Sequence, residues 1–147
     1  MATDGSSLRP GEFEIVDEGE RLWRQVNPAW IQEGRVTSQL FSPTPKDTGE
    51  VSVCRASKVS AESSYEHHTE VLGYKSVGVY SVDVVEVEDV GLRAVDDSQV
   101  NDGDERPPGH SYIDFKSASG NQRKKRASKL RDKAEKRGWQ YRPGEQS

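Results

Sequence analysis

The sequence has few of the residues that mark several common classes of protein. It contains a single cysteine, Cys54, so it can form neither an internal disulfide nor a zinc site built from several cysteines. No stretch approaches the roughly 18 consecutive apolar residues that a membrane-spanning helix needs. The first residues also carry no apolar run, so we expect no secretory signal and a cytoplasmic location.

Large apolar residues are scarce as well. Leucine, isoleucine, valine and phenylalanine together number 28 of 147 residues, and 16 of these are valine. That share lies just under the roughly 20% below which a chain becomes a candidate for disorder. The net charge is only −4, however, so charge repulsion does not oppose folding. We therefore expect a small, β-rich core with polar ends.

The small net charge conceals two segments of opposite sign. Residues 1–115 hold 10 basic and 22 acidic side chains, whereas residues 116–142 hold 11 basic and two acidic ones. This asymmetry predicts an acidic body followed by a basic element. The basic element could contact nucleic acid, an acidic partner or the acidic body itself, and each of these attractions weakens as salt is added.

Alternating apolar residues predict the strands of the body. Strands are predicted over residues 13–16, 22–26, 35–41, 50–55, 76–88 and 111–115. The run over 76–88 holds six valines and is predicted as the central strand; the slips in its alternation indicate a bulge or burial on both faces. The acidic segment over 96–109 ends in Pro-Pro-Gly and is predicted as a loop.

Two segments carry the signals of helices. Ser60 is suited to cap a first helix over residues 61–72, which Gly73 would end. A second, basic helix is predicted over residues 121–137, with a thin apolar stripe formed by Ala127, Leu130 and Ala134.

Together these elements predict an α+β fold: a mixed or antiparallel sheet of about five strands, one middle helix and a basic C-terminal helix. We divide the chain into a flexible N-terminal arm and an α+β core, followed by a basic helical segment packed on or beside that core and a short tail. Their bounds are residues 1–20, 21–115, 116–142 and 143–147.

The basic helix is the first candidate site. Lysine and arginine occur nine times between Arg123 and Arg137. Phosphate backbones attract such a cluster, and Trp139 and Tyr141 add rings on which bases could stack. The predicted nucleic-acid contacts are Arg123, Lys124, Lys125, Lys129, Lys133, Lys136 and Trp139. The alternative is a solvated amphipathic helix that docks on the sheet through Leu130, with Trp139 as part of the core.

Arg24 marks the second candidate site. It stands in the middle of an otherwise apolar strand face, where an unpaired charge would be very costly. A guanidinium also suits bidentate contacts with phosphate or carboxylate groups. We therefore predict an anion- or nucleotide-binding pocket formed by Arg24, Thr37, Ser38 and Lys46. The alternative is a structural ion pair between Arg24 and an acidic residue such as Glu86.

The middle helix carries acidic and imidazole side chains, some of them within helical reach of one another, namely Glu62, Glu66, His67, His68 and Glu70. A metal site would need further ligands, for which His110 and Asp114 are candidates. The sequence lacks an HExxH motif, so we predict no metal site and interpret the cluster as structural. Of the two histidines we expect His68 to pack in the core and His67 to be more exposed.

Cys54 is interpreted as a structural residue. A cysteine nucleophile needs a lowered pKa and a nearby base. Arg55 is adjacent in sequence, but strand alternation sends its side chain to the opposite face of the sheet.

Several short motifs resemble those of a family of small uncharacterised bacterial proteins. They are Trp-Arg-Gln-Val at 23–26, Gly-Arg-Val-Thr-Ser-Gln at 34–39, Pro-Thr-Pro-Lys-Asp at 43–47, Val-Ser-Val at 51–53 and Ser-Ala-Glu at 60–62. The resemblance spans about residues 21–142 and implies a bacterial or phage source and an intracellular location. It implies no particular activity and no catalytic residues. A fainter resemblance to NAD-using ADP-ribosyltransferase-like folds maps Arg24, Ser38 and Glu86 onto functional positions.

These observations support two hypotheses. The first is a small binding module without enzymatic activity, whose basic C-terminal helix contacts nucleic acid or an acidic protein. The second is a small nucleotide- or NAD-handling enzyme with an anion pocket around Arg24. Under neither hypothesis do we predict a permanently bound cofactor or metal. The enzyme needs a concave pocket where Arg24, Ser38 and Lys46 converge, whereas the module needs an exposed, flat basic face.

Overall fold

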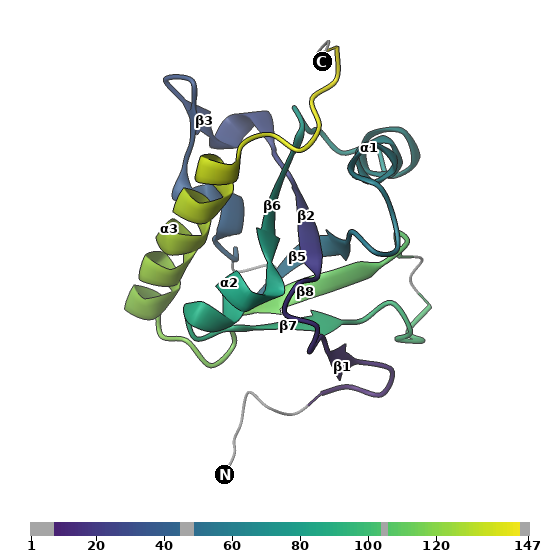
Figure 1. Cartoon of the computed structure of the whole chain (residues 1–147). Helices are drawn as coiled ribbons and strands as arrows, with labels where there is room; N and C mark the ends of the chain where they lie inside the picture. Colours follow the sequence, from purple (N-terminus) through teal and green to yellow (C-terminus); the bar gives the residue numbers. More distant parts are fainter. Residues whose placement is uncertain (1–7, 45–48, 104–105, 145–147) are drawn as a thin grey trace.

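The fold is built on an antiparallel sheet with helices packed against it (Figure 1). The computed structural model describes residues 8–44, 49–103 and 106–144. Within them six strands form the sheet, in the spatial order β1 (Phe13–Glu14), β7 (Arg93–Asp96), β8 (His110–Asp114), β5 (Glu50–Arg55), β2 (Arg21–Gln25) and β6 (Val79–Asp83). The predicted α+β class is confirmed, with one strand more than expected.

The remaining elements surround this sheet. The helices are α1 (Ala61–Glu66), which continues into a π-helical turn η5 (His67–Val71), α2 (Val84–Asp89) and α3 (Gly120–Arg137). A separate hairpin pairs β3 (Ile31–Gln32) with β4 (Arg35–Val36), between the 3₁₀ turns η2 (Pro28–Trp30) and η3 (Ser38–Phe41). No helix in the described part of the chain combines the length and apolar character needed to cross a membrane.

The sheet forks between β2 and β5. These strands pair only at Leu22 with Arg55 and at Trp23 with Cys54, whereas β2 and β6 pair along five residues. Beyond Trp23, β2 and β6 rise away from β5, β8 and β7, which run crosswise to them in Figure 1. From Arg24 onward, β2 and β5 are therefore no longer joined by strand pairing.

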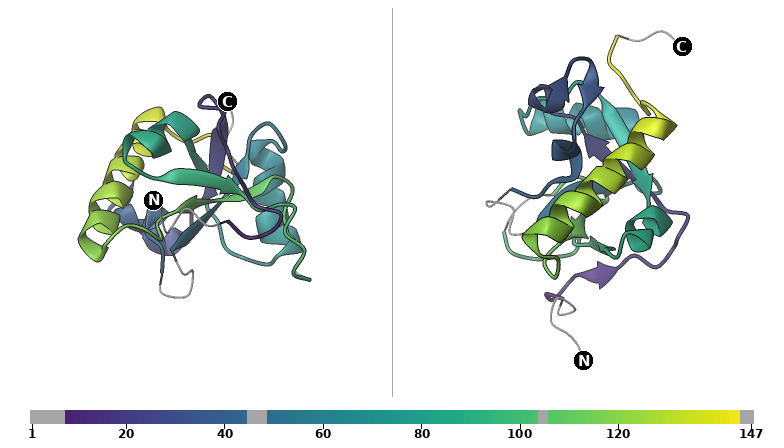
Figure 2. Two further views of the ribbon diagram at one scale, coloured as in Figure 1. Left: turned by 90° about the horizontal axis from the view of Figure 1, so that it is seen from below. Right: turned by 90° about the vertical axis from the view of Figure 1, so that its left-hand side faces the viewer.

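One face of the sheet carries the core. Leu22, Val53, Val82 and Ile113 point to this face and are buried. The helix α3 covers it together with η3, and the two views of Figure 2 show α3 lying along that side of the molecule. The predicted apolar stripe of α3 is buried in full, at Ala127, Leu130 and Ala134.

The bounds of α3 follow from its caps. The Ser119 hydroxyl accepts a hydrogen bond from the Gln122 amide, and the Gln122 side chain accepts one from the Ser119 amide, which forms a capping box. Gly138 ends the helix with a φ of 92°, in the left-handed region that favours glycine. The helix predicted over 121–137 is thus confirmed to within one residue.

The valine-rich run over 76–88 is not one central strand. It splits into β6, which lies at the edge of the sheet, and the helix α2. The Asp83 amide donates to the Glu86 carboxylate at 2.8 Å, an arrangement typical of a helix start. The slip in alternation at Val84 therefore marks the beginning of a helix that buries Val84 and Val87, and the predicted bulge is wrong.

The strand predicted over 35–41 is also wrong beyond its first two residues. Thr37 caps η3, and its hydroxyl accepts a hydrogen bond from the Gln39 amide. Leu40 and Phe41 are both buried although they are neighbours in sequence, which a helical turn allows and a one-sided strand does not. In addition β7, which begins at Arg93, falls where no strand was predicted.

The middle helix and the N-terminal segment follow the predictions in part. The Ser60 hydroxyl caps α1 by accepting from the Ser63 amide, and Gly73 follows the π-helical turn with a φ of 75°. The short strand expected near residues 13–16 is β1, which pairs with β7. Ile15 and Glu20 are buried, so the described part of the predicted flexible arm packs on the body; residues 1–7 lie outside the described residues.

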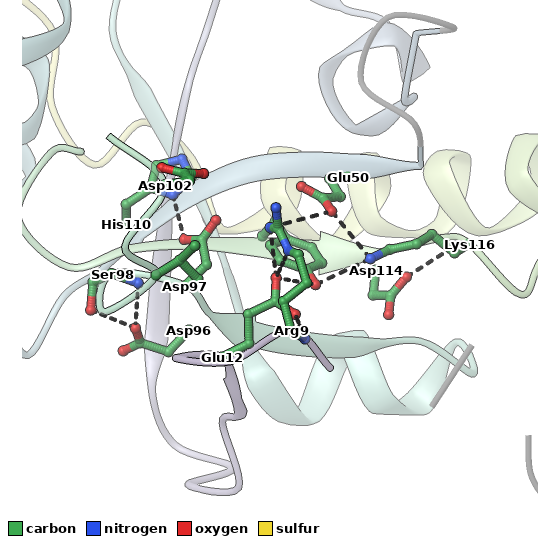
Figure 3. A network of polar contacts seen from close by, with 12 residues as sticks. Arg9, Glu12, Glu50, Asp96, Asp97, Ser98, Asp102, His110, Asp114 and Lys116 are labelled. Atoms are coloured by element: carbon green, nitrogen blue, oxygen red, sulfur yellow. Dashed lines mark hydrogen bonds and ion pairs between the residues drawn. The ribbon is translucent and has the colours of Figure 1, made fainter. Parts of the chain in front are cut away.

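Two polar networks bind this N-terminal segment to the sheet. Arg55 donates to Glu20 at 2.9 Å and to Asp96 at 2.8 Å, which joins β5 to β7 and to the residue before β2. In the second network the Tyr112 hydroxyl of β8 donates to Glu12 at 3.0 Å, and the Arg9 guanidinium lies 3.8 Å from the Glu50 carboxylate of β5 (Figure 3).

We predict that acid destabilises the protein through the first network. Burial raises the pKa of Glu20 and of Asp96, but hydrogen bonds from Ser57, Ser98 and Arg55 outweigh burial and hold both pKa values below their usual range. Their contribution is complete at neutral pH and is lost as the pH falls through the lowered folded-state values. Urea unfolding between about pH 7 and about pH 3 tests this.

The variant Glu20→Gln should flatten the loss of stability with acid, because one of the two titrating carboxylates is removed. Glu70→Gln, at an exposed position, is the control and should retain the wild-type dependence. An unchanged acid profile for Glu20→Gln would contradict the prediction.

We also predict that Val84→Asp unfolds the domain, because the side chain of Val84 is fully buried and aspartate would place an unpaired charge in the core. The expected loss is at least about 4 kcal/mol, a large part of the usual stability of a domain. Val16→Asp is the matched control, since Val16 is 78% exposed, and thermal unfolding followed by circular dichroism distinguishes them.

Candidate functional site

The arginines of α3 are bound to the rest of the protein. Arg123 donates to the Ala118 carbonyl, Arg126 to that of Gly91 and Arg131 to that of Val36. Arg137 donates to the Ser81 carbonyl at 3.0 Å and forms an ion pair with Glu86 at 2.7 Å. The planar guanidinium with its several donors suits these contacts to fixed oxygens.

The lysines of α3 behave differently. Lys124, Lys125, Lys129 and Lys136 are exposed, and Lys133 is half-buried. Within the described part of the chain none of the five forms a hydrogen bond or an ion pair. Four of them, Lys125, Lys129, Lys133 and Lys136, follow helical spacing and form one row about 16 Å long. We call this set the lysine row.

The carboxylates near the lysine row are already paired with arginines. Asp132 accepts from Arg131 at 2.7 Å, and Glu135 accepts from Arg35 at 2.6 Å. The hydrogen bond from Arg35 lowers the pKa of Glu135, so this carboxylate stays charged and engaged. Because Glu86 is bound by Arg137, none of these three carboxylates pairs directly with the lysine row.

Trp139 is part of the fold. Its ring stacks on Tyr80 with the centroids 4.2 Å apart, and the Arg142 guanidinium lies 4.5 Å from the ring centre. Trp139 is half-buried against the core, as the docked-helix alternative expects, while the lysines of the same segment remain exposed. Stacking of a base on Trp139 therefore stays a prediction without support from the geometry.

Arg24 is held by backbone carbonyls. It donates to Leu40 at 2.6 Å and to Ser52 at 2.9 Å, and its guanidinium lies 4.8 Å from the ring centre of Trp30. Its proposed ion pair with Glu86 is wrong, because Glu86 is bound to Arg137.

The predicted partners of Arg24 do not gather around it. The Thr37 hydroxyl donates to the Trp30 carbonyl, and Ser38 is the first residue of η3. Arg24 lines two hollows in the surface, and neither hollow is lined by Thr37 or Ser38. Lys46 lies outside the described residues.

A pocket of about 180 Å³ lies at the fork of the sheet, and we call it the fork pocket. All three histidines of the chain and its single cysteine line it. The residues that line it include Trp23, Arg24, Gln25, Val53, Cys54, His67, His68, Leu72, Tyr74, Pro107 and His110. From the sequence we interpreted Cys54 and the two histidines of the middle helix, His67 and His68, as structural residues and did not connect them. His110 was considered only as a possible metal ligand.

Strand pairing brings Cys54 and His110 together. They are direct partners in the register of β5 and β8. The next pair, Arg55 and Gly109, is joined by a hydrogen bond, so Cys54 and His110 form a pair of the non-hydrogen-bonded kind, whose side chains lie closest. The Nδ1 atom of His110 lies 2.6 Å from a carboxylate oxygen of Asp97, a contact that Figure 3 marks.

Burial favours the neutral forms of two groups in the fork pocket, the Cys54 thiol and the His68 imidazole. Burial raises the pKa of the Cys54 thiol to about 11, so the thiol keeps its proton. Burial and the neighbouring Arg24 charge lower the pKa of His68. Among the described residues no group of histidine, cysteine and carboxylate side chains could hold a metal ion. The pocket therefore suits binding by hydrogen bonds and apolar contact.

Comparison of the chain with protein-family models, curated proteins and solved structures finds no match. The family resemblance of residues 21–142 and the bacterial or phage source therefore stay predictions, and function is argued from geometry alone.

We predict that the arginines of α3 stabilise the fold and that the lysines do not. Arg137→Ala removes the ion pair with Glu86 and the bond to the Ser81 carbonyl, which should cost about 1–3 kcal/mol. Lys129→Ala, near the middle of the same helix, should change stability by less than about 0.5 kcal/mol. Urea denaturation of both variants measures the difference, and equal losses would contradict this division of roles.

Proposed function

We propose that the protein binds nucleic acid through the lysine row of α3, by contacts with phosphate groups that do not depend on base sequence. The observation that carries the proposal is the division of the basic residues on α3. The arginines contact the body, while the lysines are left without a hydrogen bond or ion pair in the described structure.

The charge distribution supports an external anion as partner. A positive helix next to an acidic body is expected to be neutralised by that body, and the ion pair of Arg137 with Glu86 does this at one point. Within the described structure no lysine of the row lies within ion-pair distance of a carboxylate; the charge of Lys133 acts on Glu86, but Glu86 and the two other carboxylates near the row are bound by arginines. A phosphate backbone supplies many negative charges along a line, which matches a row about 16 Å long.

The chemistry of the exposed surface favours nucleic acid over an acidic protein. Protein interfaces generally contain an apolar core, rich in aromatic residues and methionine. The apolar residues of α3 are all turned into the core, and the large exposed apolar residues of the described structure lie elsewhere, at Phe13, Val16, Val71, Leu72 and Tyr74. The lysine row therefore offers charge without an apolar anchor, as a phosphate-binding surface does.

We predict a salt dependence that reports on the number of phosphates contacted. If all four lysines of the row contact phosphates of a DNA duplex, affinity should fall about 100-fold between about 50 and about 200 mM salt. The variant Lys125→Gln/Lys129→Gln should bind more weakly, with a fall of only about tenfold over the same range. Fluorescence anisotropy of short labelled DNA and RNA of two unrelated sequences measures both effects.

The matched control is Lys58→Gln/Lys75→Gln, which changes the net charge equally at exposed positions outside α3. It should keep both the affinity and the salt dependence of the wild type. Absence of binding to DNA and RNA at about 50 mM salt would overturn the proposal. Binding to poly-glutamate alone would identify an acidic protein as the partner instead.

A further inference from the structure

The fork pocket is a consequence of the sheet topology and lies apart from the lysine row. Beyond the pairs at Leu22 and Trp23 the strands β2 and β5 separate, and the Arg24 side chain reaches across to the Ser52 carbonyl. The helix α1 and the turn η5 stand beside this opening, whereas α3 lies on the other side of β2 and β6 (Figure 1). A ligand in the pocket therefore leaves the lysine row uncovered.

The apolar walls of the fork pocket define the size and shape of a ligand. They are formed by Trp23, Val53, Leu72, Tyr74 and Pro107. A cavity of about 150 Å³ lined by apolar side chains accepts benzene. The fork pocket, with about 180 Å³, therefore has room for one aromatic ring with a small substituent.

Most polar groups on the walls already have partners. The Gln25 amide donates to the Ser64 hydroxyl at 3.1 Å and accepts from the Ser76 hydroxyl at 2.9 Å. The His68 side chain forms a hydrogen bond with the backbone of Lys75. The ligand must therefore be recognised by a group that the protein holds in place but leaves without a partner.

His67 and His110 each leave one ring nitrogen without a partner in the described structure, and His110 is the one whose ring is held by a carboxylate. Asp97 is 2% exposed and fixes the ring, because its carboxylate can only accept and Nδ1 of His110 must therefore carry a proton. In the neutral imidazole the Nε2 atom is the acceptor, and it has no hydrogen-bond partner within the described structure. An oriented acceptor beside apolar walls suits a ligand that presents an O–H or N–H group.

The charge of the walls narrows the class further. None of the described residues that line the pocket is an aspartate or glutamate, and the charged residue on the wall is Arg24. A cationic ligand would meet no counter-charge there, and the Arg24 guanidinium that an anionic ligand would need already donates to the Leu40 and Ser52 carbonyls. We propose that the fork pocket binds an uncharged aromatic molecule of one ring, whose O–H or N–H group donates a hydrogen bond to Nε2 of His110.

The pair p-cresol and toluene tests this proposal, because the two probes share a methylated ring and differ only in the hydroxyl group. Isothermal titration calorimetry should show that p-cresol binds about tenfold or more tightly than toluene, as one oriented hydrogen bond predicts. The variant His110→Phe keeps a ring at the position and removes the acceptor. It should reduce p-cresol to the affinity of toluene and leave toluene unchanged.

Cys54 provides a second readout in the unmodified protein, which does not depend on the folding of a variant. It is the single thiol of the chain and lines the same pocket. At about pH 9, where a larger fraction of the thiol is ionised than at neutral pH, iodoacetamide should alkylate it several-fold more slowly when p-cresol is present. Mass spectrometry measures the rate. Exposed side chains elsewhere give no signal in this assay, since cysteine is the residue that reacts.

Each outcome bears on a separate part of the proposal. Failure of both probes to bind and to protect Cys54 would overturn the pocket as a ligand site. Equal binding of the two probes, or a p-cresol affinity that His110→Phe leaves unchanged, would overturn the role of His110. The variant Lys125→Gln/Lys129→Gln should bind p-cresol as the wild type does, so this result is independent of the nucleic-acid proposal.

Discussion

The docking of α3 on the sheet is the interaction on which the surface of this protein depends. Leu130 and two alanines bury the apolar stripe of the helix, and arginines on its flanks donate to carbonyls and to Glu86. Docking fixes the rotation of the helix about its axis. That rotation turns the arginines toward oxygens on the body and leaves the lysine row to solvent, so a single packing contact divides one basic cluster into structural and exposed residues.

The fork of the sheet has a comparable role on the other side. Once β2 and β5 separate, backbone carbonyls at the edge of the gap need donors, and Arg24 supplies them at Leu40 and Ser52. A residue that resembles an anion-binding arginine in the sequence is therefore committed to the fold. The space left beside it is the fork pocket, whose walls combine the Arg24 side chain with aromatic and apolar side chains and the three histidines.

Elements were predicted correctly where one local signal stood alone, and wrongly where a strand-like pattern competed with a helix cap. The strands near 22–26, 50–55 and 111–115 and the helix α3 were predicted because alternation, caps and glycine stops act within a few residues. The run over 76–88 misled because valine favours strands, while the capping interaction of Asp83 with Glu86 and the burial of Val87 favour a helix. In the segment 35–41, the cap at Thr37 likewise outweighed an alternating pattern.

The sequence by itself determined the separation of an acidic body from a basic helix, because charge is carried by composition and helical spacing is local. Only the tertiary structure decided which basic residues stay exposed, because the partners of Arg131 and Arg137 lie far away along the chain. The same holds for the fork pocket. Cys54, His110 and Asp97 meet through strand register and a loop contact, and no short-range pattern in the sequence encodes either.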